Sequence, residues 1–176
     1  MMNAIFKAGI HYGLIAAVAL SLSIAPANAE ERAVAGQFTA SYSKREALPV
    51  PDAEGHVLML GEAAGRNVGL KGSDYMDGAT IVNREILDLV RGNGPHSGYV
   101  TMTMAGVQTV SRWEGTVRTS LNKDGTPNTT FEGTWTKVNG TGKYERVTGG
   151  GTYSGHFTSE NDYVVDWNGR LDFSGK

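Results

Sequence analysis

Apolar and polar residues alternate in short runs along most of the chain after residue 30, and Gly, Asn, Asp and Pro separate these runs. Alternation with a period of two is typical of strands with one buried face, and the separating residues are typical of turns. The pattern predicts eight strands, spanning residues 34–43, 56–64, 80–90, 98–104, 107–121, 129–138, 151–158 and 163–173. Eight strands suit a small closed antiparallel barrel, because closure removes the unpaired edges of an open sheet.

The strongest regularity is an aromatic residue, a glycine and a second apolar residue at alternate positions of four successive predicted strands. The triplets are Trp113-x-Gly115-x-Val117, Phe131-x-Gly133-x-Trp135, Tyr153-x-Gly155-x-Phe157 and Trp167-x-Gly169-x-Leu171. Side chains two residues apart share a face, so each triplet is predicted to face the core. A glycine in the middle of a strand indicates a sharply coiled sheet with an aromatic side chain covering the backbone, as in a barrel wall. A twisted β-sandwich is the alternative, since all-β patterns fit both architectures.

One segment fits a helix as well as a strand. Its apolar residues also fall at helical spacing: Ile81, Val82, Ile86, Leu89 and Val90. With Gly92 in the place of a C-terminal cap, this spacing is compatible with a helix over residues 79–91. We favour a strand, because residues 92–98 would then form a compact glycine-rich turn into the next strand. A strand places Asn83 and Glu85 on one face and Arg84 on the other.

The first 29 residues have the pattern of a secretory signal peptide. Lys7 gives a positive start, an apolar stretch runs from Leu14 to Ala25, and Ala27-Asn28-Ala29 has the small residues that a signal peptidase requires. We predict cleavage after Ala29 and a single domain over residues 30–176, located in the periplasm or outside the cell. The apolar stretch is short for a membrane anchor, so we expect no membrane span after cleavage.

Composition limits the functions that this domain can have. The formal net charge is −2 and the basic residues are scattered, whereas nucleic-acid binding requires clustered Lys and Arg. We therefore expect no nucleic-acid partner. The chain has no cysteine, so an exported form would depend on its core alone, without disulfides.

The segment Gly140-Thr141-Gly142-Lys143-Tyr144, continued by Val147, Gly149, Gly151 and Tyr153, resembles a pattern near the end of allene-oxide-cyclase-like barrel proteins. That group includes plant allene oxide cyclases, dirigent proteins and exported bacterial proteins of unknown function. The resemblance implies a closed barrel in which Tyr144 packs under a glycine corner. It gives no catalytic residue, because the chain does not align residue by residue with the active sites of those enzymes.

Motifs that would identify a reaction are mostly missing from the sequence. There is no G-x-S-x-G elbow, no phosphate-binding loop and no thiol nucleophile. His56, His96 and His156 lie on separate segments without the spacing of zinc ligands, so we predict no metal and no cofactor. His96 follows Pro95 in the glycine-rich turn, where it is either an acid or base at the barrel mouth or an ordinary turn residue.

The candidate ligand-binding residues combine this polar group with the aromatic residues of the strands. They are Arg84, Glu85, His96, Tyr99, Trp113, Trp135, Tyr153 and Trp167. Three functions remain open: a non-enzymatic barrel that binds a small hydrophobic molecule, a cyclase-like or dirigent-like enzyme acting on an apolar substrate, and a filled barrel that works through its surface. We favour binding over catalysis. A polar cluster inside a cavity would favour the enzyme, and a uniformly apolar lining the binder. The sequence leaves the oligomeric state open.

Overall fold

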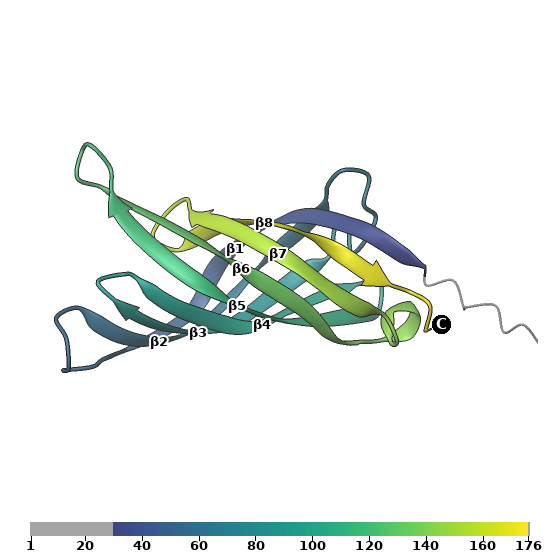
Figure 1. Cartoon of the computed structure of the whole chain (residues 1–176), viewed down its shortest axis with the longest axis horizontal. Coiled ribbons are helices and arrows are strands. Elements are labelled where there is room, and N and C mark those ends of the chain that lie inside the picture. The colour runs from purple at the N-terminus through teal and green to yellow at the C-terminus, as the bar shows by residue number, and fades with distance from the viewer. Residues whose placement is uncertain (1–29, 176) are drawn as a thin grey trace, which may run out of the picture.

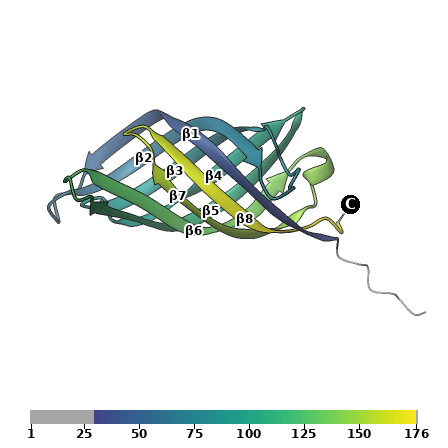
Figure 2. The ribbon, with the colours of Figure 1, turned by 90° about the horizontal axis from the view of Figure 1, so that it is seen from above.

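The computed structural model describes residues 30–175 and shows eight antiparallel strands closed into a barrel (Figure 1). The strands are β1 (Glu31–Pro49), β2 (His56–Gly69), β3 (Thr80–Val90), β4 (Gly94–Met104), β5 (Val107–Leu121), β6 (Pro127–Gly140), β7 (Thr148–Phe157) and β8 (Asp162–Asp172), with a 3₁₀ turn η1 (Gly142–Tyr144) after β6. Each strand pairs with the next, and β1 pairs with β8 to close the ring, as the view from above shows (Figure 2). The predicted barrel is confirmed, and the sandwich alternative is wrong.

The predicted strands are present, but several are longer than the sequence pattern indicated. β3 pairs with β2 along its whole length and with β4 from Thr80 to Leu87, so the helical alternative for residues 79–91 is wrong. β1 continues to Pro49 past an irregularity between Tyr42 and Lys44, where the pairing with β2 shifts by one residue. Beyond such a bulge, the side chains that would face inward face outward instead. The apolar-polar alternation is therefore interrupted, and the sequence pattern does not show that the strand continues.

The start of β4 corrects the predicted turn at residues 92–98. The turn is only Arg91–Asn93, and β4 begins at Gly94, with Pro95 as its second residue. Proline is tolerated near the first residue of a strand, where it removes little of the ladder. His96 consequently belongs to a strand, paired with Leu87 and Gly115, and its side chain is buried.

Aromatic side chains inside the barrel lie against glycines of other strands. A methyl group on Gly36 would overlap the Trp167 indole, one on Gly155 the Phe131 ring, and one on Gly169 the Trp135 ring. The Tyr153 hydroxyl lies over both Gly115 and Gly133. The triplets therefore face the core, as predicted, and Glu114, Glu132, His156 and Arg170 are exposed on the other face.

One end of the barrel is closed by the segment between β2 and β3. Tyr75 and Met76 of this segment are buried, and the Tyr75 ring packs edge-on against Trp167 and Tyr144, with centroids 6.1 and 5.3 Å apart. Asn67, also fully buried, fixes the segment: its side-chain amide donates to the Met76 carbonyl oxygen at 2.8 Å and its side-chain oxygen accepts from Trp167 at 2.9 Å.

Residues 1–29 lie outside the described part of the chain, and so does the predicted signal peptide. No helix among the described residues is long and apolar enough to cross a bilayer. At the β6–β7 corner, where the resemblance implied a glycine turn, Gly142 has a φ of +55° and Tyr144 is buried.

Gly133→Ala tests the close approach of aromatic side chains to the barrel wall. A Cβ at this position would overlap the Glu114 carbonyl oxygen and lie 2.6 Å from the Tyr153 hydroxyl. We expect a loss of about 1–3 kcal/mol in the free energy of unfolding, the usual range for overpacking. The control, Thr134→Ala on the exposed face, should change it by less than about 0.5 kcal/mol. Urea denaturation measures both, and equal stability of the two variants would contradict the packing described.

Candidate functional site

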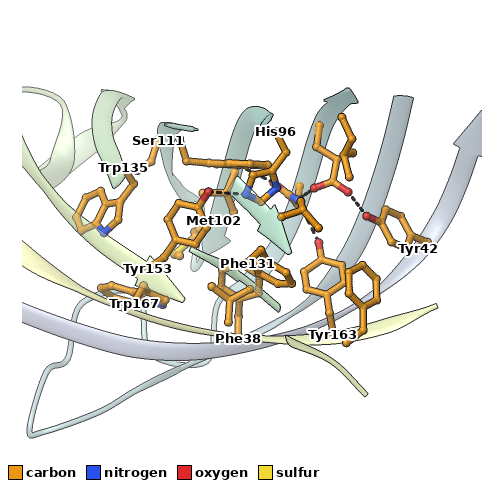
Figure 3. A pocket seen from close by; sticks show the side chains of 18 of the residues that line it. Phe38, Tyr42, His96, Met102, Ser111, Phe131, Trp135, Tyr153, Tyr163 and Trp167 are labelled. Atoms are coloured by element: carbon orange, nitrogen blue, oxygen red, sulfur yellow. Dashed lines mark hydrogen bonds between the residues drawn. The ribbon is translucent and has the colours of Figure 1, made fainter. Parts of the chain in front are cut away.

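The barrel encloses a cavity of about 70 Å³. Its lining is mainly aromatic, from Phe38, Tyr42, Tyr75, Trp113, Phe131, Trp135, Tyr153, Phe157, Tyr163 and Trp167 (Figure 3). The cavity ends beneath buried Tyr75 at the closed end of the barrel and beneath partly exposed Tyr42 and Phe157 toward the other end. Tyr42 and Phe157 are therefore the lining residues that solvent reaches.

Glu85 is the acidic residue of the cavity wall. It lies on β3, opposite Gly61 of β2 and Gly98 of β4, and only 7% of its surface is exposed. One carboxylate oxygen accepts a hydrogen bond from the Tyr42 hydroxyl, and the other accepts from the Asn83 side-chain amide at 3.1 Å. A side chain on Gly61 would collide with the Tyr42 ring and crowd Glu85, so the glycine gives Tyr42 its room to reach the carboxylate.

Asn83 connects Glu85 to two aromatic side chains. Its amide nitrogen also donates to the Tyr163 hydroxyl at 3.1 Å, and its oxygen accepts from the Trp113 indole at 2.9 Å. Because the residue is buried, these bonds satisfy polar atoms that would otherwise be costly to remove from water. The orientation of Glu85 is thus fixed by residues from β1, β3, β5 and β8.

His96 is the second ionisable group that faces the cavity. Its Nε2 is 3.0 Å from the Tyr153 hydroxyl, and its ring packs edge-on against Trp113 and Phe131, with centroids 4.8 and 5.7 Å apart. Burial lowers the pKa of His96 to about 4. The imidazole is therefore neutral near pH 7.

The same burial acts in the opposite direction on the acidic groups. It raises the pKa of Glu85, and the hydrogen bonds from Tyr42 and Asn83 only partly oppose this. It also raises the pKa values of Tyr42, Tyr153 and Tyr163 far above their ordinary value, so these hydroxyls stay protonated. The cavity consequently offers a carboxyl group with a raised pKa, a neutral imidazole and phenol hydroxyls in an apolar surrounding.

The structure brings together most of the residues chosen from the sequence. Glu85, Trp113, Trp135, Tyr153 and Trp167 line the cavity, as expected. His96 also lines it, but from within a strand rather than from a loop at the barrel mouth.

Two of the chosen residues lie on the outside. Arg84 is adjacent to Glu85 and therefore points outward, where it pairs with Glu62 at 2.9 Å. Tyr99 is three residues after His96, which places it on the opposite face of β4, and it is 51% exposed. Both are corrections that follow from strand alternation.

The candidates predicted from the sequence did not include Tyr42 and Asn83, nor the aromatic lining residues Phe131, Phe157 and Tyr163. Asn83 was predicted to share a face with Glu85, and its role follows from that position. Tyr42 continues the alternation of Phe38 and Ala40 in β1, and that pattern could have identified it. Its contact with Glu85 joins two strands that do not pair, which sequence alone does not show.

Metal binding finds no support among the described residues. Within residues 30–175, no group of three or more His, Asp or Glu side chains could hold a metal ion. His56 lies at the barrel end between Asp52 and Asp88, His96 lies inside and His156 lies on the outer face.

Comparison with known proteins adds little. No protein-family model and no curated protein matches the chain. Among solved structures, the chain is similar to a pterocarpan synthase dirigent protein, with 9% identity and a TM-score of 0.46 over 89% of this chain and 96% of that one. A likeness this weak carries no argument here. The barrel is established by its strand pairing, and the allene-oxide-cyclase-like resemblance stays a prediction from the sequence.

The burial of His96 predicts a loss of stability in acid. The folded-state pKa of about 4 lies below the ordinary 6.5, so the unfolded chain takes up the proton first as pH falls. The free energy of unfolding should fall between pH 6.5 and about 4 by about 3 kcal/mol through this residue. Urea denaturation across this range should show the fall diminished in His96→Phe and retained in the exposed control His156→Phe. Parallel pH profiles would contradict the burial of His96.

Glu85 predicts the opposite dependence. Its folded-state pKa is raised above the ordinary 4.5, so the folded protein holds this proton more tightly than the unfolded chain does. Stability should therefore fall as pH rises from 4.5 through the folded-state pKa. Glu85→Gln removes the titration, so its stability relative to the original protein should increase with pH. Glu62→Gln, at a partly exposed position on β2, serves as the control, and a difference independent of pH would contradict the interpretation.

Proposed function

We propose that the barrel binds a small, mainly apolar molecule that carries one polar group. The observation that supports this proposal is the cavity: its wall is aromatic and aliphatic, yet Glu85 and His96 face it from neighbouring strands. Apolar pockets with a few placed polar groups are typical of small-molecule sites, in which the polar groups orient the ligand.

The size of the cavity limits the ligand. At about 70 Å³ it is well below the roughly 300–1,000 Å³ of pockets for drug-sized molecules. A ligand of a few heavy atoms fits the space as it stands. A larger one requires Tyr42 and Phe157 to move, and their partial exposure leaves them room to do so.

Catalysis on such a molecule is the second candidate. Two ionisable groups with shifted pKa values face one apolar cavity, an arrangement that active sites use for acid and base catalysis. Glu85 would donate or accept a proton, and neutral His96, bonded to Tyr153, would act at a second position. Arg84, the third member of the expected polar cluster, is outside the barrel, and this weakens the case for the enzyme.

Native mass spectrometry of gently purified protein tests the proposal. We expect a reproducible added mass on the folded protein. Val117→Phe fills the cavity from a buried position and should abolish the adduct, whereas Val138→Phe on the exposed face should retain it. A released compound that reappears chemically changed after incubation with the protein would favour the enzyme. A bare protein would count against both and favour a filled barrel that works through its surface.

Export is also part of the proposal. The N-terminal 29 residues have the pattern of a signal peptide, and the same spectrum measures the mature mass. A chain that begins at Glu30 supports export to the periplasm or the medium. A chain that retains residues 1–29 in an intact cell fraction contradicts it.

A further inference from the structure

The Glu85 carboxyl group lacks a positive partner within the described chain. None of the ion pairs among residues 30–175 includes Glu85. The adjacent Arg84 forms an ion pair with Glu62 on the outer face. His96, the other ionisable group of the wall, is neutral. Removing a carboxylate from water is costly unless a cation or several hydrogen bonds compensate for it. Glu85 accepts two hydrogen bonds, which leaves about two of its four lone-pair directions for a ligand.

The wall beside Glu85 is built of aromatic rings. Tyr42, Phe157 and Tyr163 pack against one another with centroids 5.6 to 6.2 Å apart, and Phe131 lies 5.9 Å from both Phe157 and Tyr163. All four rings line the cavity together with Glu85. The faces of such rings carry negative potential and attract cations, most strongly away from water. Arg45 already stacks on the Tyr42 ring, 5.0 Å from its centroid.

We infer that the polar group of the ligand is a primary ammonium, held by Glu85 and surrounded by the rings of Tyr42, Phe131, Phe157 and Tyr163. This inference rests on the proposed binding function and specifies its ligand class. An ammonium donates hydrogen bonds to the free lone pairs of the carboxylate and also neutralises its charge. A neutral alcohol can donate one hydrogen bond to the carboxylate but does not neutralise its charge, and a carboxylic acid anion is repelled by it. The alkyl part of the amine lies in the apolar remainder of the cavity.

A series of matched probes tests this inference on the unmodified protein. n-Propylammonium, 1-propanol and propionate have similar shapes and differ in charge, and their few heavy atoms suit the size of the cavity. Probes this small bind no tighter than about tens of micromolar, so titration by NMR into the millimolar range is appropriate. The Trp113 indole proton is the reporter, because its acceptor Asn83 also donates to Glu85.

We expect propylammonium to bind at least about tenfold more tightly than propanol, and propionate not to bind. Glu85→Gln should weaken propylammonium binding by about ten- to a hundredfold and change propanol binding much less, because Gln keeps an acceptor oxygen but loses the charge. Tyr42→Phe keeps the ring and the cavity wall, and it provides a second variant with a smaller loss should Glu85→Gln fold poorly. Glu62→Gln, which changes an acidic residue on the outside of the barrel, should have no effect.

The possible results separate the two proposals. Equal binding of propanol and propylammonium, or an unchanged ratio in Glu85→Gln, would overturn the ammonium assignment while the binding function stands. Absence of any response from all three probes would overturn the ammonium assignment, and combined with a bare native mass spectrum it would overturn the binding function as well.

Discussion

The fixed width of an eight-stranded barrel is the constraint on which the rest of this structure depends. Its interior has just enough room for side chains, and this chain places aromatic rings on most of its strands. They fit because glycines on other strands leave room that a side chain would fill. Trp167 lies against Gly36, Phe131 against Gly155 and Trp135 against Gly169. The rings then meet edge to face, and only about 70 Å³ stays open. Fold and cavity are therefore products of the same pairing of rings with glycines.

Alternation along the strands explains how far the sequence could predict this arrangement. The triplets identified the inward faces of β5 to β8 correctly, because aromatic residue, glycine and apolar residue all point the same way. The same rule shows why two candidate ligand-binding residues, Arg84 and Tyr99, lie outside the barrel. Arg84 and Glu85 are neighbours, and His96 and Tyr99 differ by an odd number, so no regular strand could turn both members of either pair inward. Which residues of β4 face inward could not be predicted, because Gly94 and Pro95 resemble a turn in the sequence.

Other parts of the site depend on contacts that no local pattern encodes. The segment 70–79 has no periodic alternation, yet its Tyr75 and Met76 are buried and close one end of the barrel. Asn67 holds the segment there by a hydrogen bond to the Met76 carbonyl oxygen. In the sequence, Asn67 looks like any other inward-facing residue of β2. The contact between Tyr42 and Glu85 likewise forms across the interior, between β1 and β3. Closure of the sheet creates these contacts, and so they could be recognised only once the ring of strands was known.

Burial of Glu85 and His96 is hard to explain by stability alone. Apolar residues of similar size at these two positions would fill a barrel that is already almost full, without the cost of removing ionisable groups from water. His96 meets this cost by remaining neutral and bonding to Tyr153. Glu85 has two hydrogen bonds but no cation within the described chain, although Arg84 is next to it in sequence and points the other way. Groups retained at such a cost are typical of functional sites. A carboxyl group without a cationic partner, held by Tyr42 and Asn83 near the partly exposed Tyr42 and Phe157 rings, is best explained by a partner that comes from outside the chain.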